Sequence, residues 1–245
     1  MPLEVRRRKY GKLDALVVQS DQGPKIPVVL CHGYGAPGDD LVPNVEVLAD
    51  WLETSVEQFR FVFPAAPLTP PELAMYGGRA WWEINMAKLL AASQSGMFSQ
   101  LYDLEPPGMA VASDLLAGCV EAVLEESGNP SRYALGGFSQ GAMVTINTAL
   151  RTSIPAPTLL AQFSGTLVCR PLWRDALAGG RLDETFVLQS HGRYDTVLPF
   201  AAAEALQGLL NEHSVQHESI GFDGPHTIPL EALMQFAVRL KHLIQ

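Results

Sequence analysis

The feature that most constrains the fold is the pentapeptide Gly137-Phe138-Ser139-Gln140-Gly141. It follows Tyr133-Ala134-Leu135, an apolar run typical of a buried strand, and precedes small residues that suit the start of a helix. A serine on so sharp a turn takes a strained backbone conformation, and the two glycines let strand and helix approach without Cβ clashes. The turn lifts the hydroxyl above the sheet, where the new helix directs its N-terminus. We interpret Ser139 as a nucleophile; the alternative is a tight turn with an idle serine.

Short apolar runs alternate with longer helical ones, which is typical of a mostly parallel sheet covered by helices on both faces. The length of 245 residues fits a single α/β domain, 1–245. Ser113 is expected to cap one helix, and Gly128 to terminate it. The predicted strands are 13–19 (at an edge), 28–30, 61–63, 133–138, 159–163, 186–189 and 218–220, and the predicted helices are 45–51, 115–125, one from residue 140, 200–210 and 230–243.

Residues 84–108 interrupt this alternation. They are rich in Met, Leu, Ser and Gln and end in Glu105-Pro106-Pro107-Gly108. Two interpretations are open: a lid inserted over the edge of the sheet, or a surface helix with a loop.

Composition narrows the possible partners. Seventeen basic and 26 acidic residues give a net charge of −9, which argues against nucleic acid or an anionic membrane as a partner. No segment approaches the roughly 18–20 apolar residues of a membrane span. The basic run Arg6-Arg7-Arg8-Lys9 is expected to be a solvated leader to the first strand, rather than a phosphate-binding or membrane patch. The three cysteines have neither metal-ligand nor disulfide spacing, which predicts a cytoplasmic location.

A serine nucleophile needs a base and an acid, which in this type of strand-turn-helix site follow the serine in the order acid, histidine. Asp195 lies in a turn directly after the strand 186–189, at the same sheet edge as Ser139. His226 lies in the loop Gly224-Pro225-His226-Thr227, where an imidazole can reach both the serine and the acid. Asp223 is too close to His226 in sequence to be the stronger candidate. Other candidates lie in less suitable places: Asp175 and Asp183 on predicted surfaces, and, among the histidines after Asp195, His213 and His217 at element ends and His242 on the last helix.

The attacked carbonyl needs fixed donors for its developing charge. We expect these to be the backbone N–H groups of Gln140 and of Tyr34, which lies in the loop after an early strand. His32 in that loop is interpreted as a loop-organising residue. Residues 33–38 also match the dinucleotide fingerprint G-x-G-x-x-G, but Asp39 follows where it would repel a pyrophosphate, and Pro37 removes a donor.

Four motifs in order resemble the phospholipase/carboxylesterase family, which includes carboxylesterases, acyl-protein thioesterases and lysophospholipases. They are the segment 30–35, the segment 136–142 around Ser139, the stretch from His191-Gly192 through Asp195 to Pro199, and the Pro225-His226 pair. The segment Ala80-Trp81-Trp82-Glu83-Ile84 is similar to the tryptophan-containing segment beside that family's acyl pocket. Gly-Tyr-Gly-Ala-Pro-Gly-Asp stands where many relatives have Gly-Leu-Gly-Asp, and Pro225 stands where glycine is more usual.

The resemblance implies an α/β-hydrolase fold and a serine hydrolase of carboxylic esters or thioesters, with Ser139, Asp195 and His226 as the triad and no metal or cofactor. Trp81, Trp82 and Met86, with Leu89, Met97 and Phe98, are candidates for the acyl pocket, although several could simply be core. The alternatives are a catalytically silent binding protein on the same fold and, more remotely, a dinucleotide-linked oxidoreductase. The motifs leave open the leaving group, the acyl length and the oligomeric state.

Overall fold

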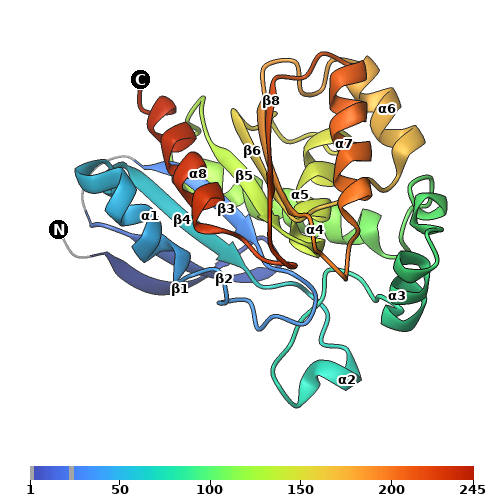
Figure 1. Ribbon diagram of the computed structural model, residues 1–245. Coiled ribbons are helices and arrows are strands. Elements are labelled where there is room, and N and C mark those ends of the chain that lie inside the picture. Colours follow the sequence, from blue (N-terminus) through green and yellow to red (C-terminus); the bar gives the residue numbers. More distant parts are fainter. Residues whose placement is uncertain (1–2, 22–24) are drawn as a thin grey trace.

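The computed structural model describes residues 3–21 and 25–245, which form one eight-stranded sheet with helices on both faces (Figure 1). The strand order is β1-β2-β4-β3-β5-β6-β7-β8. The β1/β2 and β2/β4 pairs are antiparallel, and every pairing from β4 to β8 is parallel. The strands are β1 (Glu4–Tyr10), β2 (Leu13–Gln19), β3 (Ile26–Cys31), β4 (Phe59–Pro64), β5 (Ala134–Phe138), β6 (Leu159–Phe163), β7 (Phe186–Gly192) and β8 (His217–Phe222).

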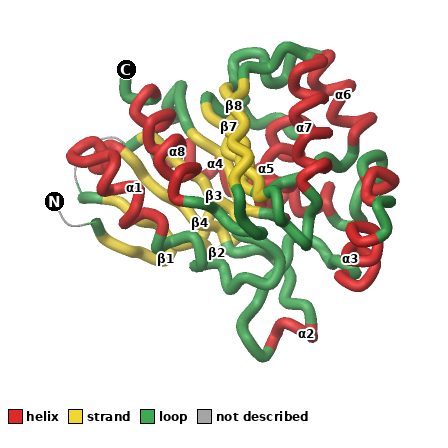
Figure 2. The backbone as a smooth tube through the Cα atoms, viewed as in Figure 1, coloured by secondary structure: helices red, strands yellow, loops and turns green. Residues whose placement is uncertain are grey.

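The helices divide into two layers, which the tube of Figure 2 separates clearly from the strands. One layer is α1 and α8, and the other is α4, α5, α6 and α7. The helical segments are α1 (Asn44–Leu52), η1 (Glu53–Gln58), α2 (Pro71–Ala74), α3 (Met86–Gln94), η2 (Phe98–Leu101), α4 (Met109–Glu126), α5 (Gln140–Arg151), α6 (Arg170–Ala178), α7 (Phe200–Glu212) and α8 (Leu230–His242). This arrangement confirms the predicted fold class.

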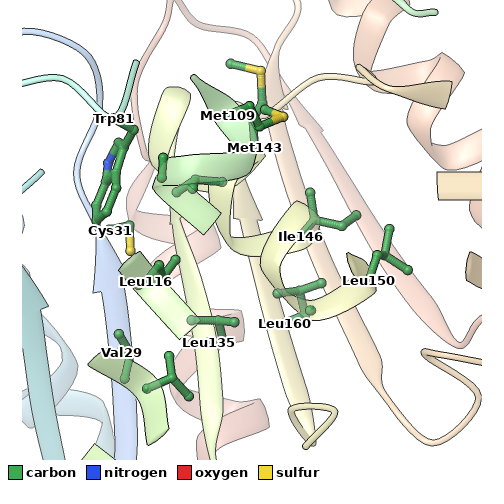
Figure 3. Packing of buried hydrophobic residues seen from close by; sticks show 14 of the residues in the cluster. Val29, Cys31, Trp81, Met109, Leu116, Leu135, Met143, Ile146, Leu150 and Leu160 are labelled. Carbon is green, nitrogen blue, oxygen red and sulfur yellow. The ribbon is translucent and has the colours of Figure 1, made fainter. Parts of the chain in front are cut away.

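The core lies on both faces of the sheet because neighbouring residues of a strand point to opposite sides. In β5, Ala134 packs in the cluster under α1 and α8, whereas Leu135 packs in the cluster under α4 and α5. Figure 3 shows the second cluster, where Leu135 and Leu160 of the sheet face Leu116 of α4 and Ile146 of α5. Burial on both faces explains why the central strands read as continuous apolar runs.

The sequence predicted that the basic run near the N-terminus is a leader to the first strand. That prediction was wrong, because the run forms most of β1. Arg6 pairs with Val17, and Lys9 pairs with Asp14, so β1 is an edge strand and β2 lies inside the sheet. Only Tyr10 of β1 is buried. An edge strand that leaves both faces in water carries no apolar alternation, and charged side chains there discourage pairing with another chain.

The prediction for α4 was also wrong at its start. The helix begins at Met109, after Gly108 with φ of 90°, so Ser113 lies inside it and caps nothing. Ser113 is buried and accepts a hydrogen bond from Asn147 Nδ2 at 2.8 Å. The C-terminal end matches the prediction, because Gly128 has φ of 81° two residues after the helix ends. Helix α6, which follows Cys169, had not been predicted.

The segment 84–108 lies outside the two helical layers, beside α6 and α7 in Figure 1. Its first helix, α3, buries none of its residues, whereas Phe98 and Tyr102 farther along are buried. The end of the segment is fastened to α6: the Arg170 N–H donates to the Tyr102 carbonyl, and the Arg170 guanidinium pairs with Asp103 at 2.6 Å. The segment is therefore anchored at its second half and exposed at its first.

Candidate active site

Ser139 sits on the turn between β5 and α5 with φ of 55° and ψ of −118°. Its N–H is held by the Phe163 carbonyl at 2.8 Å, which fixes this unfavourable conformation. The flanking glycines are required by close contact with β3. A Cβ on Gly137 would lie 2.5 Å from the Cys31 carbonyl oxygen, and one on Gly141 would lie 2.0 Å from it.

Ser139, His226 and Asp195 come from the carboxyl ends of β5, β8 and β7, and the structure brings all three together. The His226 Nε2 lies 2.9 Å from Ser139 Oγ, and its Nδ1 lies 2.6 Å from Asp195 Oδ2. Because a carboxylate only accepts, Nδ1 carries the proton and Nε2 is free to accept the serine hydroxyl proton. Phe138 packs against the imidazole with ring centroids 4.8 Å apart.

The Asp195 carboxylate is surrounded by donors. Its Oδ1 accepts the Val197 and Leu198 N–H groups, each at 2.8 Å. Its Oδ2 accepts from His226 and also lies 3.2 Å from His191 Nε2. Burial alone would raise the pKa of Asp195, but the hydrogen bonds from His191, His226 and the Leu198 N–H outweigh it and hold that pKa far below its usual value. The carboxylate therefore stays charged beside His226.

The loop after β3 lies against the nucleophile. An added Cβ on Gly33 would lie 3.3 Å from Ser139 Cβ, so Tyr34 follows at a point beside the reacting group. Across the described residues, the Tyr34 N–H donates no backbone hydrogen bond, whereas the next N–H, of Gly35, is bound to the Arg79 carbonyl at 2.8 Å. Gln140 is the first residue of α5, where a backbone N–H has no partner within the helix. Both predicted donors are thus available on the two sides of Ser139.

His32 organises this loop and makes no contact with the triad. Its Nδ1–H donates to the Gly33 carbonyl at 2.8 Å, and its Nε2 accepts the Ala66 N–H at 2.9 Å. Burial lowers the pKa of His32 to about 4, so the ring is neutral in this position. The His32 carbonyl in turn accepts the Trp81 indole N–H at 3.0 Å.

The Gln140 side chain has a role that the sequence did not reveal. Its Oε1 accepts the Trp81 N–H at 2.9 Å, and its Nε2 donates to the Trp82 carbonyl at 2.8 Å. The two bonds fasten the tryptophan segment to the residue that follows the nucleophile. A local motif gives no signal of this contact, because the partners are about 60 residues apart.

A largely apolar cavity of about 440 Å³ opens beside the triad. Its wall includes two neighbours of the triad: Met143, whose N–H binds the Ser139 carbonyl one turn into α5, and Leu198, whose N–H binds Asp195. Its other apolar walls include Trp82, Leu89, Phe98, Leu101 and Val168.

Not every predicted pocket residue lies at this cavity. Trp81 lines a second cavity, of about 500 Å³, which shares Trp82 with the first. Met86 and Met97 are absent from the walls of both cavities among the described residues. The reason for Met86 is its position on α3: the cavity meets Asn85, Lys88 and Leu89, which share a helix face that Met86 does not.

Comparison with known proteins identifies the family of this chain. The model of the Phospholipase/Carboxylesterase family matches residues 13–244. The chain belongs to this family. It is 29% identical over 188 residues to acyl-protein thioesterase 1 of Eremothecium gossypii, covering 76% of this chain and 72% of that protein. The crystal structures of esterase PE8 (24% identity, TM-score 0.69, 99% and 100% coverage) and of Zea mays acyl-protein thioesterase 2 (20%, 0.67, 94% and 99%) have the same fold.

Membership of the Phospholipase/Carboxylesterase family makes the protein a hydrolase of ester or thioester bonds. The structure does not support residues 33–38 as a dinucleotide-binding loop. The third glycine, Gly38, leads into a turn, and α1 begins only at Asn44. A pyrophosphate-binding loop would need a helix N-terminus at that glycine. In the described ranges, no helix combines the length and apolar character required to cross a membrane.

Proposed function

We propose that this protein is a serine hydrolase that cleaves carboxylic esters or thioesters through an acyl-enzyme, with Ser139, His226 and Asp195 as its triad. The observation that carries the proposal is the continuous hydrogen-bond chain from Ser139 Oγ to His226 at 2.9 Å and on to Asp195 at 2.6 Å. Each link has the polarity that proton abstraction from a serine requires.

In the first half-reaction, Ser139 Oγ bonds to the substrate carbonyl carbon while His226 Nε2 takes the hydroxyl proton. His226 then gives that proton to the alkoxide or thiolate as its bond to the acyl carbon breaks. In the second half, His226 takes a proton from water, the resulting hydroxide attacks the acyl-serine, and Ser139 recovers its proton as the carboxylic acid leaves. Asp195 stays ionised throughout and stabilises the imidazolium.

The backbone N–H groups of Tyr34 and Gln140 hold the negative oxygen of each tetrahedral intermediate. Two observations support this assignment: a Cβ on Gly33 would lie only 3.3 Å from Ser139 Cβ, and neither N–H has a backbone partner in the described part of the chain. The N-terminus of α5 adds its partial positive charge. Removing one such donor costs a factor of about 100 to 1,000 in turnover in comparable sites.

The acyl group is assigned to the 440 Å³ cavity, with Trp82 as its predicted wall. The segment 84–108 is a lid over this cavity, supported by Leu89, Phe98 and Leu101 in its wall and by the absence of buried residues in α3. Lid and sheet together form a single domain, 1–245. An acyl chain of a thioester, a small ester or a lysophospholipid fits the same apolar walls. The cytoplasmic location stays a prediction.

The test is hydrolysis of p-nitrophenyl esters of increasing acyl length, and of the matching thioesters, by wild type and Ser139→Ala. Ser214→Ala is the matched control, because Ser214 also has a left-handed φ, of 56°, but is exposed after α7. We expect Ser139→Ala to abolish turnover and fluorophosphonate labelling and Ser214→Ala to keep both. No turnover of any ester together with no labelling of Ser139 would favour the silent binding protein instead.

A further inference from the structure

His191 lies on β7 behind the catalytic acid, and nothing in the triad mechanism uses it. Its ring is buried, with the residue only 1% exposed. The Nε2 lies 2.8 Å from the Leu198 carbonyl oxygen and 3.2 Å from Asp195 Oδ2. Because both of these atoms can only accept, Nε2 carries the proton, which it donates to the Leu198 carbonyl while Asp195 Oδ2 lies close by as a second acceptor.

The rest of the ring has no competing role. Its Nδ1 is buried without a hydrogen-bond partner among the described residues. One edge of the ring meets Phe200 of α7 at 6.1 Å between centroids. The charged groups around it among the described residues are few: Asp195 in contact, the exposed Glu204 at the same small cavity, and Arg193, which stacks on the ring of Phe200. The Nε2–H is therefore the one polar contribution of this buried side chain.

Asp195 Oδ2 consequently lies between two imidazoles. His226 donates to it along the catalytic axis at 2.6 Å, and the His191 Nε2–H, which is bound to the Leu198 carbonyl, lies 3.2 Å away on the other side. The other oxygen, Oδ1, is already held by two backbone N–H groups. An N–H dipole beside Oδ2 has two effects. It holds the Asp195 carboxylate in the orientation that accepts from His226, and it partly neutralises negative charge on Oδ2 that would otherwise act on His226 alone.

From this geometry we infer that His191 is a positioning residue for the reaction, acting through Asp195 to set the orientation and the basicity of His226. The inference rests on the proposed function, since it assigns His226 the part of the base. Without the His191 donor, the charge on Oδ2 would stabilise the His226 imidazolium more strongly. The pKa of His226 would then rise, and the carboxylate would hold the ring less well aligned with Ser139.

Two substitutions separate this role from simple packing. His191→Phe keeps a planar ring and removes the donor, whereas His191→Gln places an amide N–H near the position of Nε2. His242→Gln is the control, since His242 is exposed at the end of α8. For His191→Phe we expect kcat on p-nitrophenyl acetate to fall about tenfold with KM nearly unchanged, and the acid limb of kcat/KM to move up by roughly half a pH unit. His191→Gln recovers most of both.

The deciding measurement is the titration of His226 followed by NMR in the folded proteins, because it needs no turnover. A higher His226 pKa in His191→Phe, restored in His191→Gln, supports the inference even if no ester proves to be a substrate. The same His226 pKa in wild type and His191→Phe would overturn it, whatever the effect on rate. Should His191→Phe fail to fold, the comparison of His191→Gln with His191→Asn decides, since the shorter amide cannot reach Oδ2: equal His226 pKa values would overturn the inference.

Discussion

Replacing Asp195 by Asn is the sharpest test of the proposed triad, because the structure fixes how the new amide must lie. The two N–H groups of Val197 and Leu198, each at 2.8 Å from Oδ1, require the amide oxygen at that position. The amide nitrogen then faces the imidazoles at the position of Oδ2, 2.6 Å from His226 Nδ1 and 3.2 Å from His191 Nε2. Two donors cannot face each other, so His226 must move its proton from Nδ1 to Nε2.

A His226 with its proton on Nε2 no longer accepts from Ser139. The expected loss in kcat is about 10⁴-fold, as in a comparable serine triad whose acid was changed to its amide. That factor corresponds to about 5.5 kcal/mol of lost transition-state stabilisation. The fold should be retained, because the amide is isosteric and Oδ1 keeps both backbone hydrogen bonds.

The assay is kcat on p-nitrophenyl acetate at pH 7, with thermal unfolding to verify the fold. Asp223→Asn is the matched control: Asp223 lies three residues before His226, but its side chain is 73% exposed and pairs with Arg193 at 3.5 Å. We expect Asp223→Asn to retain wild-type activity. If Asp195→Asn kept more than about a tenth of the activity while folded, or if Asp223→Asn were the inactive variant, the assignment of the acid would be wrong.

Three further predictions concern the elbow, the oxyanion loop and the cavity. Gly141→Ala places a Cβ 2.0 Å from the Cys31 carbonyl oxygen of β3 and should lower the free energy of unfolding, measured by chemical denaturation, by roughly 3 kcal/mol or more. Gly118→Ala on α4, where a Cβ meets nothing within 4 Å, should raise that free energy by about 0.5 kcal/mol. The pKa of His32 is about 4 in the folded protein and 6.5 in the unfolded chain, so on acidification the unfolded chain binds the proton first. The free energy of unfolding should therefore fall by up to roughly 3 kcal/mol between about pH 6.5 and 4, and His32→Gln should reduce that loss. Val168→Trp fills the 440 Å³ cavity and should reduce kcat/KM for esters of long acyl chains at least about tenfold while leaving the acetate ester unaffected. Val238→Trp, at an exposed position, is the control, and equal losses on all esters would contradict the assignment of the acyl group to this cavity.

The parts of the fold that the sequence predicted are those governed by local rules. The central strands are apolar because both faces are buried, and the pentapeptide around Ser139 combines a strand, a strained turn and a helix within a few residues. Asp195 and His226 followed from the same logic, since both lie just after predicted strands, and parallel strands end at a common edge. These inferences needed no knowledge of distant contacts.

The parts that it missed depend on contacts between distant segments. An exposed edge strand such as β1 has no apolar alternation, so a run of arginines there looks like a leader. Ser113 is polar and lies near a helix start, but its partner Asn147 belongs to another helix, and only packing reveals the pair. Met86 was a candidate for the pocket because it is apolar, but the face of α3 that meets the cavity is the neighbouring one, and apolar character alone does not select a helix face.

The active edge of the sheet is held together by residues that no motif contains. Ser164 follows β6 with a positive φ of 49°, and Ser139 follows β5 with φ of 55°. The Ser139 N–H binds the carbonyl of Phe163, the Ser164 N–H binds that of Ser190, and the Ser164 hydroxyl donates to the carbonyl of Thr227. Each strand end is thus fastened to the next, from the nucleophile to the loop of His226. These hydrogen bonds hold Ser139 in its strained backbone conformation. They also keep the His226 loop close enough for the imidazole to reach the Ser139 hydroxyl.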